Sequence, residues 1–503
     1  MKILFTAAEC APFFKTGGLG DVAGALPKAL AKKGNEVRVV LPFYTTMPEK
    51  YQAKLTDLFN FYVSVGWRMQ YCGVKTLKMD GVQYYFLDNK YYFDRPGIYG
   101  YYDDGERFAF FQQAVIELMQ RISYIPDILH CNDYHTAFIP FLLREKYGWI
   151  EAFNHVATVL TIHNLEFQGQ YGREVMSELF GMSADRYDDG TIQMGDAVNF
   201  MKAGIFYADR INTVSPSYAA EIQTKEFGCG LDDILRMCSF KLSGILNGID
   251  YETNDPEKDP TIPYNFSVKN LAGKKKDKEA LQKKFGLPVK PDVPLIGIVS
   301  RLTYQKGFQL VSQEMSNLMQ FNVQLVVLGT GYDNFEHDFR YFSGRYPEKC
   351  SACIDFDVEL AQQIYAGCDM FLMPSAFEPC GLSQMISMRY GTLPIVRETG
   401  GLRDSVQPYN RFTGEGTGFS FANFNAYELA DTIRRALALY HDDHDAYCRV
   451  QRQAMSQDFS FTRSAEDYAH LYLLLLPEDT TPKHDAADEA FRSPIGALET
   501  GAA

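Results

Sequence analysis

The segment KTGGLGDV, residues 15–22, places a lysine and three glycines in front of a possible helix. A strand-like run, residues 2–8, precedes it, and an amphipathic run, residues 21–34, follows it. Adjacent glycines can expose consecutive backbone N–H groups, and a helix N-terminus attracts anions. Lys15 adds a full positive charge, and Asp21 is in place to cap the helix. The segment predicts a phosphate-binding loop, and the alternative is a structural turn beside a surface lysine.

Two features of this loop disagree with a dinucleotide-binding fingerprint, although Gly18, Gly20 and Ala23 fit its relaxed form. Residues 9–16 separate the glycines from the strand, whereas the fingerprint has them directly after it. The second predicted strand, residues 36–42, is followed by aromatic residues and not by an acidic residue that would hold a ribose. The loop also lacks the triphosphate-binding pattern GxxxxGK[ST].

A second set of charged residues follows predicted strands in the other half of the chain. SRLTYQKG, residues 300–307, places Arg301 and Lys306 on one loop between a strand and a helix. Ligands bind open α/β sheets at the carboxyl ends of the strands. An arginine can fork onto a diphosphate and a lysine supplies a compact charge, so the loop is a candidate phosphate contact. The alternative is a pair of solvated loop charges.

The segment PSAFEPCGLSQM, residues 374–385, places Glu378 between a buried-looking strand and a helix start. A carboxylate there could accept sugar hydroxyls and stabilise a developing positive charge, or it could only face a helix dipole. TGGLRDSV, residues 399–406, repeats the paired glycines of the opening loop, with Asp404 as the expected helix cap. Two such sheet edges facing each other would enclose a nucleotide diphosphate sugar.

The elements that must position these residues alternate between strand and helix patterns, which predicts parallel sheets covered by helices. The expected strands are residues 2–8, 36–42, 83–88, 127–131, 158–163, 295–302, 323–331, 369–375 and 391–398, and the expected helices include 21–34, 108–122 and 307–320. A turn-rich stretch from residue 254 precedes KKKDKEALQKKFGLP, which reads as a solvated basic helix. The fold class is therefore α/β with two Rossmann-like domains.

The predicted domains are residues 1–245 and residues 246–455. A helix near 456–476 is expected to cross back onto the first domain, and residues 477–503 are expected to be a disordered tail because they contain few apolar residues.

Composition excludes several classes of partner. Over 503 residues, 49 Lys and Arg against 63 Asp and Glu give a net charge of −14, which argues against nucleic acid. No apolar run of about 18 residues is present, so no membrane span is expected. Glu9 interrupts the short apolar start, so we expect no signal peptide, a cytoplasmic protein and ten mostly reduced cysteines. A lone CxxC, Cys350 and Cys353, is a weak signal for zinc.

These motifs together resemble the bacterial glycogen synthases and plant starch synthases, over roughly residues 1–475. The matching segments, in the family's order, are KTGGLGDV with GALPKAL, FDRPGIYG, TIHNLEFQG, NFMKAGIFYAD, TVSPSYAAEI, GILNGID, SRLTYQKG, FEPCGLSQM and TGGLRDSV. The resemblance implies a GT-B architecture, in which two Rossmann-like domains face each other across a deep cleft. It implies transfer of glucose, with retention, from ADP-glucose to the non-reducing end of an α-1,4-glucan such as glycogen. It implies no metal and no other cofactor, and it leaves the oligomeric state open.

The resemblance also implies roles for individual residues. In the first domain, the acceptor side, Lys15, Gly17 and Gly18 would lie against the diphosphate, Asp21 would belong to the same loop, His163 would contact glucose, and Asp133 would line the cleft. In the second domain, the donor side, Arg301 and Lys306 would neutralise the leaving diphosphate, and Glu378 would stabilise the oxocarbenium-like transition state. Cys380, Gly381 and Leu382 would lie beside the sugar and its phosphates. Asn247 would line the cleft.

The chain departs from the family pattern in one segment near these residues. The usual HxHDWH is HCNDYH here, residues 130–135, so that Asn132 and Tyr134 replace a histidine and a tryptophan. We interpret these replacements as drift that could alter acceptor handling. The alternatives for function are a related glycosyltransferase that uses UDP-glucose with another acceptor, and an inactive glucan- or nucleotide-binding protein.

Overall fold

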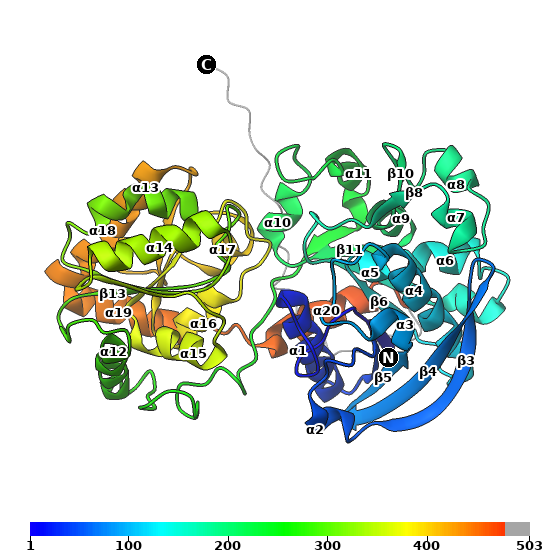
Figure 1. Cartoon of the computed structure of the whole chain (residues 1–503), viewed down its shortest axis with the longest axis horizontal. Coiled ribbons are helices and arrows are strands. Elements are labelled where there is room, and N and C mark those ends of the chain that lie inside the picture. Colours follow the sequence, from blue (N-terminus) through cyan, green and yellow to red (C-terminus); the bar gives the residue numbers. More distant parts are fainter. Residues whose placement is uncertain (478–503) are drawn as a thin grey trace, which may run out of the picture.

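Two mainly parallel β-sheets organise the chain, one in each of two lobes (Figure 1). The computed structural model describes residues 1–477, and within them the first lobe contains a nine-stranded sheet and the second a six-stranded sheet. This arrangement confirms the predicted fold class. The predicted disordered tail, apart from Pro477, lies outside the described residues.

The first sheet has the strand order β12-β11-β7-β6-β1-β2-β5-β4-β3. Among these strands β4 alone runs in the opposite direction, so its pairs with β3 and β5 are antiparallel. Its central strands are buried on both faces, as helix-covered parallel strands must be, and β6 has no exposed residue. The strands are β1 Lys2–Thr6, β2 Glu36–Pro42, β3 Thr56–Val65, β4 Arg68–Met79, β5 Val82–Asp88, β6 Ile128–Asn132, β7 Ala157–Ile162, β11 Arg210–Thr213 and β12 Leu242–Gly244.

The second sheet is parallel throughout, in the order β15-β14-β13-β16-β17-β18. Helices α13, Phe308–Leu318, α16, Ser383–Arg389, and α18, Ala426–Asp442, belong to this lobe. The strands are β13 Leu295–Val299, β14 Gln324–Leu328, β15 Cys350–Cys353, β16 Met370–Met373, β17 Leu393–Arg397 and β18 Phe419–Phe421.

The structure confirms the predicted strands to within a few residues, but the β3–β4 hairpin was not predicted. Helix α1, Gly18–Lys32, also begins three residues earlier than expected, at the glycines themselves. Glycine is a poor helix former, so its presence argued locally for a loop.

The chain crosses between the lobes after β12 and again before helix α20, Phe461–Leu473. The crossings lie side by side, because the Ile249 N–H donates to the Phe459 carbonyl at 2.7 Å. Helix α20 then packs on the first lobe, where the Tyr472 hydroxyl lies 2.6 Å from His130 Nδ1. This packing supports the division that we propose, with domains 1–245 and 246–455 and α20 joining the first.

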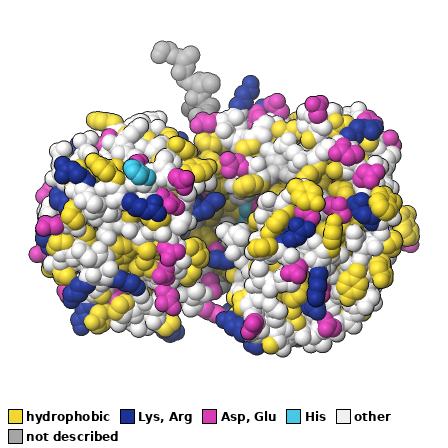
Figure 2. Space-filling view, viewed as in Figure 1, with side chains coloured by type: hydrophobic (Ala, Val, Ile, Leu, Met, Phe, Trp, Pro, Cys, Tyr) yellow, Lys and Arg dark blue, Asp and Glu magenta, His cyan; other side chains and the backbone are white. Residues whose placement is uncertain are grey.

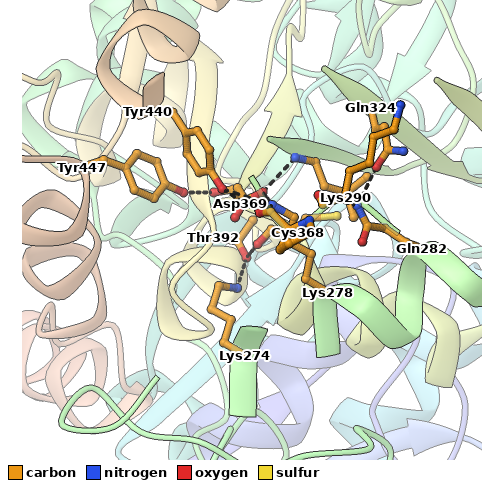
Figure 3. Close-up of polar contacts among 12 residues, drawn as sticks. Lys274, Lys278, Gln282, Lys290, Gln324, Cys368, Asp369, Thr392, Tyr440 and Tyr447 are labelled. Atoms are coloured by element: carbon orange, nitrogen blue, oxygen red, sulfur yellow. Dashed lines mark hydrogen bonds and ion pairs between the residues drawn. The ribbon is translucent and has the colours of Figure 1, made fainter. Parts of the chain in front are cut away.

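Helix α12, Ala272–Lys284, is not the solvated helix that its lysines predicted. Lys274 and Lys278 are each only 5% exposed. Lys274 Nζ donates to Thr392 Oγ1 at 2.7 Å, and Lys278 Nζ pairs with Asp369 at 2.7 Å (Figure 3). Burial lowers the pKa of Lys274 to about 8. The expectation was wrong because the two lysines, four residues apart, share the face of the helix that packs on the lobe.

No helix within residues 1–477 is both long and apolar enough to cross a membrane.

Candidate active site

The carboxyl ends of the two sheets meet at the boundary between the lobes, where Figure 2 shows the molecule hollowed. Ser215, which follows β11, donates its hydroxyl hydrogen to the carbonyl of Pro379, which follows β16, at 2.6 Å. Every segment predicted to carry site residues leaves a strand or enters a helix at one of these two edges. This is the edge at which open α/β sheets bind ligands.

The opening loop presents Lys15, Thr16, Gly17 and Gly18 at the surface. Lys15 Nζ pairs with Asp21 at 2.6 Å, and both side chains are partly exposed. The N-cap of α1 is Gly17, so the expectation that Asp21 caps the helix was wrong: Asp21 lies in the first turn and holds Lys15. A Cβ atom added to Gly18 would meet no atom within 4 Å, so the backbone there faces open space.

Glu9 anchors this loop from behind, a role that sequence reasoning missed. Its carboxylate accepts from the Thr16 N–H at 2.5 Å, the Thr16 hydroxyl at 2.8 Å and the Gly20 N–H at 3.1 Å. Burial raises the pKa of Glu9, while these hydrogen bonds act in the opposite direction. The sequence offered only the nearness of Glu9 to KTGG as a signal.

Lys306 and Glu378 form a partly buried ion pair at the carboxyl edge of the second sheet, with Nζ and Oε2 2.6 Å apart. The Ser375 hydroxyl donates to the same carboxylate oxygen at 3.0 Å. Gly307, with φ 78°, lets the two loops approach, since a Cβ atom there would lie 1.9 Å from the Pro374 carbonyl oxygen. The structure thus brings together a cation and a carboxylate that are 72 residues apart in the sequence.

Arg301 lies on the same loop as Lys306, and its side chain is exposed. Among residues 1–477, no hydrogen bond links Lys15 to the Lys306–Glu378 pair. The guanidinium of Arg301 forms no hydrogen bond or ion pair with the same residues. Five unpaired N–H donors are therefore available for an anion at this edge.

Cys380, Gly381 and Leu382 connect Glu378 to helix α16. Gly381 has φ 72°, which favours glycine, and Leu382 is the N-cap residue of the helix. Cys380 is buried beside the backbone N–H of Asn247 from the first crossing, and burial raises the pKa of its thiol to about 12. Asn247 Oδ1 is also buried and has no hydrogen-bond partner among the described residues. A buried acceptor without a partner suits a ligand that brings its own hydroxyl or amine.

Asp133 and His163 meet at the carboxyl edge of the first sheet. Asp133 Oδ1 accepts from the His163 backbone N–H at 2.7 Å, and burial raises the pKa of Asp133 to about 7. Its backbone, at φ 55° and ψ −178°, lies in a region that residues other than glycine rarely adopt. Strain of this kind costs of order 1–3 kcal/mol and often accompanies a functional site.

Asn132, one of the departures from the family pattern, orients His163. Its Nδ2 donates to the Thr6 carbonyl at 3.0 Å, which leaves Oδ1 facing His163 Nε2 at 2.9 Å. Burial lowers the pKa of His163 to about 3, so the ring is neutral at pH 7. A neutral ring can donate to Oδ1 only if Nε2 carries the hydrogen, and Nδ1 is then an acceptor.

Comparisons with known proteins agree with this geometry. Residues 2–237 match the family model for the starch synthase catalytic domain, and residues 277–453 match that for glycosyl transferases group 1. A glycogen synthase from Ligilactobacillus salivarius is 66% identical over 94% of this chain and 99% of its own length. A glycogen synthase from Streptococcus sanguinis is 60% identical over 95% of this chain and 100% of its own.

Two solved structures share the fold. The catalytic domain of starch synthase IV from Arabidopsis thaliana, bound to ADP and acarbose, has a TM-score of 0.88 and 34% identity, covering 94% of this chain and 99% of its own. A sucrose-phosphate synthase from Thermosynechococcus elongatus, at 18% identity and a TM-score of 0.60 over 94% and 98% of the two chains, shares the fold alone. These matches cover nearly all of the described residues, and this chain therefore belongs to the family of glycogen and starch synthases, two-domain glycosyltransferases of GT-B architecture.

Proposed function

We propose that this protein transfers glucose from ADP-glucose to the 4-hydroxyl at the non-reducing end of an α-1,4-glucan, with retention of configuration. The observation that carries the proposal is the Lys306–Glu378 pair, held at the carboxyl edge of the donor-side sheet beside the unpaired guanidinium of Arg301. The starch synthase structure with ADP and acarbose supports the choice of donor and acceptor class.

Charge separation dictates the roles of the donor-side residues. Cleavage of the bond between the anomeric carbon and the phosphate leaves negative charge on the diphosphate and positive charge on the sugar ring. Arg301, Lys306, Lys15 and the amides of Gly17 and Gly18 would stabilise the diphosphate, and preorganised charges and dipoles of this kind usually contribute most of the catalytic rate enhancement. The Glu378 carboxylate would stabilise the sugar and accept its hydroxyls.

Retention requires either two displacements or attack from the face that the diphosphate leaves. A double displacement needs a nucleophile on the opposite face of the sugar. We propose same-face attack, in which the acceptor 4-oxygen bonds to the anomeric carbon while its proton moves to the departing phosphate oxygen. His163 would contact the glucose, and Asp133, Asn247, Cys380, Gly381 and Leu382 would line the cleft around it.

Donor competition tests the proposal. The protein is incubated with glycogen and either ADP-glucose or UDP-glucose carrying labelled glucose, and incorporation into glycogen is measured. We expect incorporation from ADP-glucose to be faster, and β-amylase should release the label because the new linkage is α-1,4. Faster incorporation from UDP-glucose would favour the related glycosyltransferase, and no incorporation from either donor would favour the binding protein.

A further inference from the structure

A short helix of the acceptor-side lobe reaches across the boundary and holds both ends of one donor-side helix. This helix, α10, Pro216–Glu221, lies beside α17, Gly400–Ser405, where the two lobes meet in Figure 1. It belongs to the motif TVSPSYAAEI, to which the proposed function assigns no role. Ser217, at its start, donates from its backbone N–H and its hydroxyl to Asp404 at 2.7 and 2.6 Å. Asp404 is therefore not the helix cap that the sequence predicted, but a link between the lobes.

The other end of α10 holds the start of α17. The half-buried Glu221 carboxylate accepts from the Gly400 N–H at 2.9 Å and from the Thr399 hydroxyl at 3.1 Å. Thr399 and Gly400 are buried, so these donors would have no partner if the carboxylate were removed. A buried donor without a partner destabilises the conformation in which it is buried. The TGG loop is consequently not an open anion site, because a side chain from the other lobe already occupies its donors.

The loop that Glu221 holds is packed directly on the backbone of Glu378. The Gly401 N–H donates to the Glu378 carbonyl at 3.1 Å. A Cβ atom on Gly400 would lie 2.0 Å from that carbonyl oxygen, and one on Gly401 would lie 2.2 Å from the Cys380 carbonyl oxygen. The backbones of the TGG loop, residues 399–401, and of Glu378 are therefore packed closely and hydrogen-bonded, so a shift of the loop toward Glu378 must displace the Glu378 backbone.

We infer that Glu221 is a positioning residue for the transfer reaction, which acts across the lobe boundary by fixing the TGG loop and, through it, the carboxylate of Glu378. The inference rests on the proposed function of Glu378. Catalysis then depends on the arrangement of the lobes, because the position of Glu378 is fixed only while α10 contacts α17. Lys306 and Arg301 lie on a separate loop, so donor binding depends less on Glu221 than turnover does.

The test compares Glu221→Ala with the matched variant Glu252→Gln in the glycogen assay. Glu252 also links the lobes, through an ion pair with Lys32 at 3.2 Å, but its side chain is 81% exposed. We expect Glu221→Ala to lower kcat about 10- to 100-fold, since a misplacement of about 1 Å can cost about 100-fold. The KM for ADP-glucose should change little, and the Tm should fall by only a few degrees because two buried donors lose their partner. Glu252→Gln should match the wild type in all three quantities.

A kcat for Glu221→Ala within about twofold of the wild type would overturn the inference. A fall in kcat accompanied by a large fall in Tm and by a rise in the KM for ADP-glucose of similar factor would also overturn it. Thr399→Val removes one partner of Glu221 at nearly constant shape, so it serves if Glu221→Ala fails to fold. Its kcat should fall by a smaller factor, and the double variant should lose less than the product of the two effects. An inactive wild type would instead refute the proposed function, and calorimetric titration with ADP would then still report whether the donor site is intact.

Discussion

Glu378 and Lys306 neutralise each other in the structure, although the proposed mechanism needs each for a different partner. The Lys306 ammonium would turn toward the diphosphate and the Glu378 carboxylate toward the sugar. The pair is therefore a resting contact that the donor must replace. Its short distance of 2.6 Å and its partial burial indicate that the two charges are held in position before the donor arrives.

Replacing Glu378 by glutamine should separate turnover from nucleotide binding. We expect Glu378→Gln to lower kcat at least about 100-fold, a typical loss for one electrostatic group of an active site. ADP should bind as tightly as before or more tightly, because Lys306 loses its competing carboxylate. Rate measurements with ADP-glucose and calorimetric titration with ADP check this, and an equal loss of turnover and ADP affinity would contradict a transition-state role.

Three histidines lie in or beside the first sheet: His130 in β6, His135 in helix α5 (Tyr134–Ala137) and His163 directly after β7. Burial lowers the pKa of His130, His135 and His163 to about 3 in each case. A histidine with a depressed pKa in the folded state stabilises the fold above its unfolded pKa of about 6.5, and this stability is lost as the pH falls. Asp133, whose pKa is raised, has the opposite dependence, so single variants isolate each contribution.

The replacement His130→Gln should flatten the acid limb of the stability curve. Between pH 6 and pH 4, the wild-type free energy of unfolding should fall by about 1.4 kcal/mol per pH unit more than that of the variant. Urea unfolding at each pH measures the difference. The exposed His155 provides the control, and His155→Gln should follow the wild-type slope. Parallel curves for the wild type and His130→Gln would contradict a buried neutral His130.

Helix α12 is fixed to the second lobe by its buried lysines, and this predicts a large loss of stability when the Lys278–Asp369 pair is broken. The Asp369 carboxylate also accepts from the Leu295 N–H at the start of β13, so it cannot readily turn to water. Lys278→Met should lower the free energy of unfolding by about 3–5 kcal/mol, because it leaves a buried charge without its partner. Lys283→Ala, on the exposed face of the same helix, should change it by less than about 0.5 kcal/mol. If urea unfolding gave a similarly small change in the free energy of unfolding for both variants, the Lys278–Asp369 pair would not contribute to stability.

At the scale of the whole molecule, the two crossings are the place where the lobes can rotate. A Cβ atom on Gly248 would lie 2.6 Å from the Phe461 backbone nitrogen and 2.7 Å from the Ser460 carbonyl carbon. Residues on either side of the crossings are tied to their own lobes: the Ile245 N–H donates to Thr213, and Tyr390 donates to Asp259 at 2.6 Å. Hinge closure around a ligand is common in two-domain proteins, and it would bring the opening loop to the donor-side cations.

Small-angle scattering should therefore report a smaller radius of gyration when ADP is bound. Gly248→Ala should reduce this change, because the added methyl group must displace backbone at the crossing. Gly344→Ala is a suitable control, since a Cβ atom at that position meets nothing within 4 Å. Identical scattering of the wild type with and without ADP would contradict closure.

The sequence by itself determined most of the strand and helix order, the placement of Arg301, Lys306 and Glu378 in loops that follow strands, the position of Lys15 just before a helix, and the family. These features depend on local periodicity, on the rule that ligands bind at the carboxyl ends of parallel strands, and on motifs read in order. Each is a property of residues that are close together in the chain.

Only the tertiary structure decided which polar side chains meet. Glu221 contacts Gly400 across 179 residues, and Lys278 reaches Asp369 across the packed face of α12, yet both would read locally as solvated charges. Asn132 looked like drift until its amide was seen to set the orientation of His163. The physical reason is the same in each case: periodicity states which face of an element is buried, but the partner of a buried charge is set by how distant elements pack.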